Sequence, residues 1–144
     1  MNTVIDRLLS TAKTIAIVGL SNKPERDSFK VAQYLQSNGY RILAINPMLA
    51  GIEILGEVCY ASLQAAQLAA DLDIDIVDCF RKAEDIPVIV DEALAVKAKS
   101  IWMQLGIINE SAANKAAKAG LDVVMDKCTK IEHKRWQEES VDRA

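Results

Sequence analysis

Apolar and polar positions alternate along the chain in blocks that predict strands followed by helices. Five short apolar runs have the length of a strand, at residues 14–19, 41–46, 73–80, 100–104 and 121–125. The segments between them carry apolar residues three or four positions apart, the spacing of a helix that packs one face on a core. Short turns join the blocks, which is typical of βαβ units. We therefore predict a doubly wound α/β fold, with helices on both faces of a mainly parallel sheet.

Capping residues mark the ends of several predicted helices. Asp27 or Ser28 is expected to cap the second helix, and Gly39 to end it in a left-handed conformation. Thr129 opens the last helix, which we expect to fray after Trp136. Further helices are expected at residues 3–9, 62–70, 84–94 and 109–120, and a short edge strand at 57–58.

The length and charge of the chain narrow its class. With 144 residues, 51% of them hydrophobic, it can bury one good core, and no linker or repeat divides it. We therefore expect a single domain over residues 1–144, with a core at about 8–136 and a frayed tail. A net charge of −3 offers no general basic face, so a nucleic-acid partner is not expected.

Hydropathy and cysteine usage indicate the compartment. No apolar run approaches the roughly 20 residues that a membrane span needs, and residues 1–13 lack the basic-then-apolar order of a signal peptide. Cys59, Cys79 and Cys128 are odd in number and lack the spacing of a metal site. We therefore expect a cytoplasmic protein with reduced thiols and no membrane partner. The oligomeric state stays open, a homo-oligomer included.

The predicted sheet would bring distant segments to one edge. In a parallel sheet the carboxyl ends of the strands lie together, and ligands bind along that edge. The segments that would converge there are residues 19–26, 46–47, 80–81, 104–106 and 126–128.

The loop after the first strand has the composition of an anion site. Gly19 lets the backbone turn sharply and approach a ligand, and Ser21 adds a hydroxyl donor. Lys23 and Arg26 bring two positive charges. The following helix would direct unpaired N–H groups toward a phosphate. The alternative is a plain strand-to-helix turn with solvated charges.

Two common nucleotide motifs are missing from this loop. A dinucleotide site needs Gly-x-Gly-x-x-Gly and an acid near the end of the second strand. The loop instead reads Gly19-x-Ser21-x-x-Pro24, and no acid lies between Asp27 and Glu53. The Gly-Lys-Ser/Thr ending of a P-loop is also missing. Both NAD and P-loop ATP hydrolysis are therefore disfavoured.

A series of ordered motifs resembles one known family over roughly residues 8–136. The motifs lie at residues 18–28, 46–47, 54–57, 77–81, 102–106, 126–128 and 132–133. They look like those of the stand-alone CoA-binding protein family, the YccU-like group. That family is similar in fold to the CoA-binding N-terminal domain of the succinyl-CoA synthetase alpha subunit. The resemblance implies a Rossmann-like domain that holds coenzyme A along the carboxyl edge of its sheet.

The same resemblance implies contacts for individual residues. The first loop would meet the phosphates through Gly19, Leu20, Ser21 and Lys23, with Arg26 adding charge. The adenosine part would lie against Asn46, Pro47, Phe80, Arg81 and Ile86. Further along the crevice would lie Gln104 and Gly106.

One departure from the family pattern concerns the 3′-phosphate. Met48 follows Asn46-Pro47 at a position where the pattern has a lysine or another polar residue. Arg41 or Lys82 would then supply the missing charge.

Few residues suggest covalent chemistry. Cys128 precedes a predicted helix N-terminus, which favours thiolate, so it is a candidate contact for the thiol of CoA. A small packed residue is the simpler alternative. His133, the only histidine, is expected to be solvated or packed at the domain edge. Asp73 and Asp75 share a strand face but are more simply solvating acids, so neither a catalytic residue nor a metal site is predicted.

Three functions follow from these patterns. The leading hypothesis is a non-catalytic protein that binds coenzyme A or an acyl-CoA. An alternative is the CoA-binding component of an acyl-CoA ligase or transferase that acts with a separate subunit. A NAD(P)-binding oxidoreductase is disfavoured by the missing glycines and ribose acid.

Overall fold

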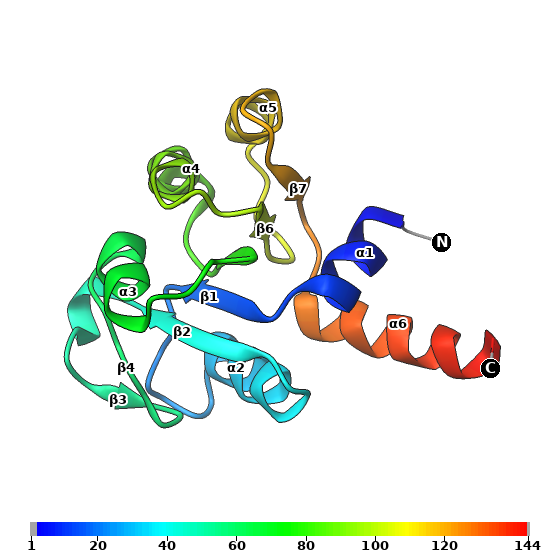
Figure 1. The fold of residues 1–144 in the computed structure, drawn as a ribbon, viewed down its shortest axis with the longest axis horizontal. Coiled ribbons are helices and arrows are strands. Elements are labelled where there is room, and N and C mark those ends of the chain that lie inside the picture. The colour runs from blue at the N-terminus through cyan, green and yellow to red at the C-terminus, as the bar shows by residue number, and fades with distance from the viewer. Residues whose placement is uncertain (1–2, 144) are drawn as a thin grey trace.

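A five-stranded parallel sheet forms the centre of the protein. In a computed structural model that describes residues 3–143, its strands stand in the order β2-β1-β5-β6-β7. Every neighbouring pair in this sheet is parallel (Figure 1). The strands are β1 (Thr14–Val18), β2 (Arg41–Ile45), β5 (Ile76–Cys79), β6 (Ser100–Met103) and β7 (Asp122–Val124). The predicted parallel α/β sheet is confirmed.

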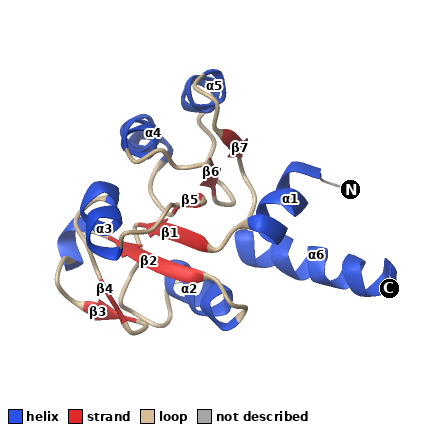
Figure 2. Cartoon of the chain, in the orientation of Figure 1, coloured by secondary structure: helices blue, strands red, loops and turns tan. Residues whose placement is uncertain are grey.

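Within residues 3–143, six α-helices cover the two faces of the sheet. One face carries α1 (Thr3–Thr11), α2 (Asp27–Ser37) and α6 (Thr129–Arg143), and the other α3 (Leu63–Ala70), α4 (Ile86–Ala95) and α5 (Glu110–Lys118) (Figures 1 and 2). Alternate strand residues enter the two cores, so Ile15 and Ile17 face one layer, while Ala16 and Val18 face the other. Because both faces are covered, most strand residues are apolar, and the doubly wound prediction is confirmed.

A single residue extends the sheet beyond β2. The short strands β3 (Glu53–Ile54) and β4 (Glu57–Val58) pair with each other as a separate antiparallel hairpin. Tyr60 then forms a parallel bridge to Ile45, with its N–H 2.9 Å from the carbonyl oxygen of Ala44. If Tyr60 counts as a reduced third strand, the sheet order becomes 3-2-1-4-5-6, the order of the Rossmann fold.

The start of α2 differs from the prediction. Neither Asp27 nor Ser28 caps the helix, because Arg26 occupies the cap position and makes no side-chain cap. The Ser28 hydroxyl instead accepts a hydrogen bond from the N–H of Ser21 (3.0 Å) and so ties the preceding loop to the helix. The predicted end is confirmed, since Gly39 is left-handed, with φ +94°.

The start of β5 also differs from the prediction, since the strand begins at Ile76 rather than Asp73. The Asp75 carboxylate accepts hydrogen bonds from the N–H groups of Lys13 (2.8 Å) and Thr14 (3.0 Å). It also pairs with Lys99 at 3.1 Å. Asp75 therefore joins three segments at the amino edge of the sheet, one residue before β5 begins, and its own N–H bonds to the Thr14 carbonyl oxygen at 3.0 Å.

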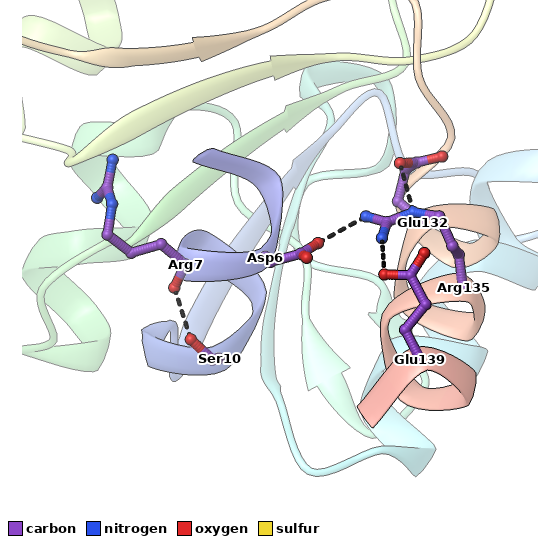
Figure 3. Close-up of polar contacts among 6 residues, drawn as sticks. All are labelled: Asp6, Arg7, Ser10, Glu132, Arg135 and Glu139. Atoms are coloured by element: carbon purple, nitrogen blue, oxygen red, sulfur yellow. Dashed lines mark hydrogen bonds and ion pairs between the residues drawn. The ribbon is translucent and has the colours of Figure 1, made fainter. Parts of the chain in front are cut away.

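The last helix continues to Arg143 rather than fraying after Trp136. Figure 3 shows the reason, because the Arg135 guanidinium contacts three carboxylates around it. It pairs with Glu132 (3.3 Å) and Glu139 (2.9 Å) on α6 and with Asp6 on α1 (2.6 Å). The first two pairs stabilise the helix along its length, and the third holds it against α1. Within residues 3–143, no helix combines the length and apolar character that a membrane span requires.

Candidate ligand-binding site

The two strands at the centre of the sheet, β1 and β5, end side by side at the point where the winding direction reverses. In doubly wound folds, ligands bind at this switch point. The loop after β1 begins at Gly19, which has φ +89°. A Cβ atom at this position would overlap the Phe80 carbonyl oxygen and the Arg81 side chain. Glycine is thus needed both for the turn and for the close approach of the two loops.

A small cavity lies directly against the loop after β1. Its volume is about 370 Å³, and it is lined by Gly19, Ser21, Lys23, Arg26, Asp27, Ser28 and Phe80. Five of these residues, Gly19, Ser21, Lys23, Arg26 and Phe80, are ligand contacts predicted from the sequence. The first turn of α2 forms one wall, and a helix that starts without a side-chain cap leaves N–H donors free for an anion.

A second cavity of about 240 Å³ lies on the other side of Gly19, toward β2 and α4. Pro47 and Arg81, two further predicted contacts, line it. Its other walls are mostly aliphatic, and Glu84, Asp85 and Glu92 add acids. A flat, largely apolar group with polar edges suits these walls.

A third and larger cavity, about 1110 Å³, opens between α2, α6 and the loops that follow β5 and β6. Gln104 and Cys128 line it, together with Phe80 and Arg81. Phe80 is shared with the first cavity and Arg81 with the second, so the three spaces adjoin along the carboxyl edge of the sheet.

Four residues that the sequence grouped with the site do not line these cavities. Leu20 is fully buried, and its carbonyl oxygen accepts a hydrogen bond from the Asn46 side chain at 3.0 Å. The Asn46 oxygen in turn accepts from the N–H of Met48 at 3.0 Å, so Asn46 holds the loops after β1 and β2 together. Ile86 is also fully buried at the start of α4. Gly106 donates its N–H to Asp126 at 2.7 Å, which joins the loops after β6 and β7.

The two basic residues considered for the 3′-phosphate have different surroundings. Arg41 opens β2 at the amino edge of the sheet, where it pairs with Glu57 at 2.8 Å. It therefore lies at the wrong end of the strand, and the expectation that Arg41 compensates for Met48 is wrong. Lys82 lines the largest cavity and remains a candidate.

A buried polar cluster beneath the site was not predicted from the sequence. Asp78 is fully buried and accepts hydrogen bonds from Gln104 and from the Thr129 hydroxyl (2.9 Å). Gln104 also donates to the Thr129 hydroxyl at 2.8 Å. Burial raises the pKa of Asp78 to about 7, although both hydrogen bonds oppose the rise. Its only sequence signal was an acid within an apolar strand.

The remaining candidates for chemistry fall in different places. Cys128 is half-buried and lines the largest cavity just before α6. His133 is buried, and a hydrogen bond of 2.8 Å joins its Nδ1 atom to the Tyr34 hydroxyl, so the solvated alternative is wrong. Burial lowers the pKa of His133. Across residues 3–143, no group of three or more His, Cys, Asp or Glu side chains is placed to hold a metal ion.

Comparison with known proteins decides which family has this arrangement. The chain matches the family described as CoA binding domain over residues 13–134. The chain belongs to this CoA-binding family. It is 38% identical over 129 residues to the uncharacterized protein YneT of Bacillus subtilis, with 90% of this chain and 91% of YneT covered.

Solved structures of other proteins share the fold of this CoA-binding family member. A protein of Thermus thermophilus, cell-free ID.343, superposes with a TM-score of 0.84 at 37% identity, covering 94% of this chain and 99% of that one. The fold extends to RSP, a Rex-family repressor solved with β-NADH, at a TM-score of 0.58 and 17% identity, covering 94% of this chain and 65% of RSP. That second likeness concerns the fold alone.

Proposed function

We propose that this protein binds coenzyme A, free or acylated, along the carboxyl edge of its sheet and catalyses no reaction alone. The observation that carries the proposal is the cavity at the loop after β1. There Lys23 and Arg26 stand beside an uncapped helix N-terminus at the switch point of the fold. Both features favour a polyanion over a neutral ligand. Membership of the CoA-binding family supports coenzyme A as that polyanion.

The three adjoining cavities suggest an orientation for the ligand. The diphosphate would lie against Gly19, Ser21, Lys23 and Arg26. The adenine would occupy the aliphatic cavity beside Pro47, with Arg81 between that cavity and the large one. The pantetheine arm would extend past Phe80 toward Gln104 and Cys128, and Lys82 would supply charge for the 3′-phosphate. Leu20, Asn46, Ile86 and Gly106 would then act through the shape of the loops, since hydrogen bonds and packing hold them away from the cavities.

The residue after β2 supports coenzyme A over a nicotinamide dinucleotide. Dinucleotide sites place an acid near this point to bind the ribose hydroxyls. Here the position holds Asn46, whose side chain is already bonded to Leu20 and Met48. An acid is therefore not available where NAD would need it.

Calorimetric titration tests the proposal. Coenzyme A, dephospho-CoA and NAD would be titrated into the purified protein under one set of salt conditions. We expect coenzyme A to bind most tightly and dephospho-CoA about tenfold more weakly, because one charge-assisted contact contributes roughly 1.5 kcal/mol. Equal or tighter binding of dephospho-CoA or NAD would contradict the assignment.

A separate experiment tests the placement of the thiol end. A CoA thiol near Cys128 should allow exchange with CoA disulfide, in which the Cys128 thiolate attacks one sulfur and a CoA thiolate leaves. Mass spectrometry of the intact protein should then show one CoA adduct that maps to Cys128. The variant Cys128→Ser should show none, while Cys59 and Cys79, which are buried, should stay unmodified. Absence of the adduct on the native protein would remove Cys128 from the ligand contacts.

A further inference from the structure

Two large aliphatic side chains at the largest cavity stay exposed to solvent. Leu105, in the loop after β6, is 65% exposed, and Ile131, in the first turn of α6, is 56% exposed. Both line the cavity, as do the partly buried Ile107 and the buried Val31. Exposed apolar side chains that gather around one cavity, rather than standing singly, mark a surface that a ligand covers.

The charges of this cavity differ from those of the phosphate loop. At the loop, Lys23 and Arg26 face a single acid, Asp27. The large cavity instead mixes basic and acidic side chains in nearly equal number, namely Lys30, Arg81, Lys82 and Lys130 against Asp27, Glu84 and Asp85. Arg81 and Asp85 form an ion pair at 3.7 Å. With Lys82 assigned to the 3′-phosphate, the remaining three basic side chains face three acidic ones, so the large cavity offers no excess positive charge to a further anionic group.

We propose that this cavity holds the acyl chain of an aliphatic acyl-CoA, with Leu105 and Ile131 packing against the chain. The inference rests on the proposed function, because the diphosphate at Gly19 fixes where the rest of the ligand begins. Phe80 and Asp27 line both the loop cavity and the large one, so a ligand anchored at the loop passes directly from one to the other. Free coenzyme A would leave the aliphatic side chains uncovered, whereas an acyl group would cover them.

The apolar contact predicts that affinity rises with the length of the acyl chain. Full burial of one methylene group strengthens binding roughly fourfold. Because the cavity is open to solvent on one side, we expect about a tenfold gain in total from coenzyme A to octanoyl-CoA. Butyryl-CoA should lie between the two. Succinyl-CoA, which has the same chain length as butyryl-CoA but ends in a carboxylate, should bind more weakly than butyryl-CoA.

The test is a set of calorimetric titrations below the micelle concentration of the longest ligand. The native protein is compared with Leu105→Ser combined with Ile131→Ser, and with the control Leu68→Ser. Leu68 is 86% exposed on α3 and lines none of the three cavities of the site. The double variant should lower the ratio of octanoyl-CoA to CoA affinity from about ten to below about three, and the control should keep the native ratio.

Three results would overturn the inference. Equal affinity of the native protein for coenzyme A and octanoyl-CoA would contradict the acyl subsite while leaving the proposed function intact. Tighter binding of succinyl-CoA than of butyryl-CoA would show that charge, not apolar contact, selects the acyl group. Failure of every CoA species to bind would reject the proposed function, and the acyl subsite with it.

Discussion

The carboxyl edge of the sheet holds two polar regions that are built in opposite ways. The loop from Gly19 to Arg26 is open, and its basic side chains are exposed and free of ion pairs among the described residues. The cluster of Asp78, Gln104 and Thr129 is buried, and its members bond to one another. Within residues 3–143, no buried side-chain nitrogen or oxygen lacks a partner.

This difference indicates that the open loop serves to bind a ligand, whereas the buried cluster stabilises the fold. A free charge on an exposed loop gains most when a ligand arrives, and it contributes little to folding. A buried carboxyl group needs hydrogen-bond partners inside the protein. Its loss leaves those partners unpaired, which destabilises the fold and shifts the side chains that they hold. Substitutions in the two regions should therefore affect stability and binding in different proportions.

The largest effect is expected at Gly19, where the loop after β1 packs against Phe80 and Arg81 in the loop after β5. Gly19→Ala should lower the free energy of unfolding by about 3 kcal/mol or more, because its Cβ atom overlaps the Phe80 carbonyl oxygen in a strained, left-handed conformation. Urea unfolding followed by circular dichroism measures the loss. Gly51→Ala is a matched control, since Gly51 also has φ +89° but has nothing within 4 Å of the added atom. Equal losses in the two variants would show that the close approach of the loops is unimportant.

A smaller effect, with a defined pH dependence, is expected in the buried cluster. Because the pKa of Asp78 is raised to about 7 in the folded protein, the native state binds a proton more tightly than the unfolded state does. The stabilisation is complete below pH 4 and is lost as the pH rises through 7. Relative to Asp78→Asn, which cannot ionise, the native protein should therefore lose about 2 kcal/mol between pH 5 and pH 7. If plots of the free energy of unfolding against pH are parallel for the two proteins, Asp78 has an ordinary pKa.

The smallest effect on stability is expected in the open loop. Lys23→Ala combined with Arg26→Ala should change the free energy of unfolding by less than about 0.5 kcal/mol, since neither side chain forms an ion pair with any of residues 3–143. The same variant should weaken coenzyme A binding about tenfold or more, because two charge-assisted contacts are lost. Lys13→Ala with Lys118→Ala removes the same charge away from the site and serves as the control, since both side chains are exposed and neither pairs with an acid among residues 3–143. If the Lys23→Ala, Arg26→Ala variant binds coenzyme A with native affinity, these two charges do not hold the phosphates.

The sequence predicted those features that depend on neighbouring residues. Strands covered on both faces are mostly apolar, so the strands at 14–18 and 100–103 were visible directly in the sequence. Gly39 was assigned correctly because the end of a helix needs a left-handed residue. The edge where β1 and β5 end followed from the parallel topology alone.

Features that depend on distant partners were not predictable in this way. The burial of Asp78 depends on Thr129, 51 positions later in the chain. The cap of α2 was wrongly assigned to Asp27 or Ser28, since Arg26 is the cap residue and the Ser28 hydroxyl accepts a hydrogen bond from the N–H of Ser21. The persistence of α6 beyond Trp136 depends on Arg135 reaching Asp6 on α1. In each case a side chain bonds to a residue of another segment, and the local sequence does not reveal that partner.

The most direct test of the account is an NMR titration of the ¹⁵N-labelled protein with coenzyme A. We expect shifts of the amide signals at residues 19–29 and 80–82, where the phosphates would meet the loop and the start of α2. The signals of Leu68, Asp71 and Lys97, which line a groove between α3 and α4, should stay in place. Saturable shifts confined to that groove, with the signals of residues 19–29 unmoved, would contradict the central claim.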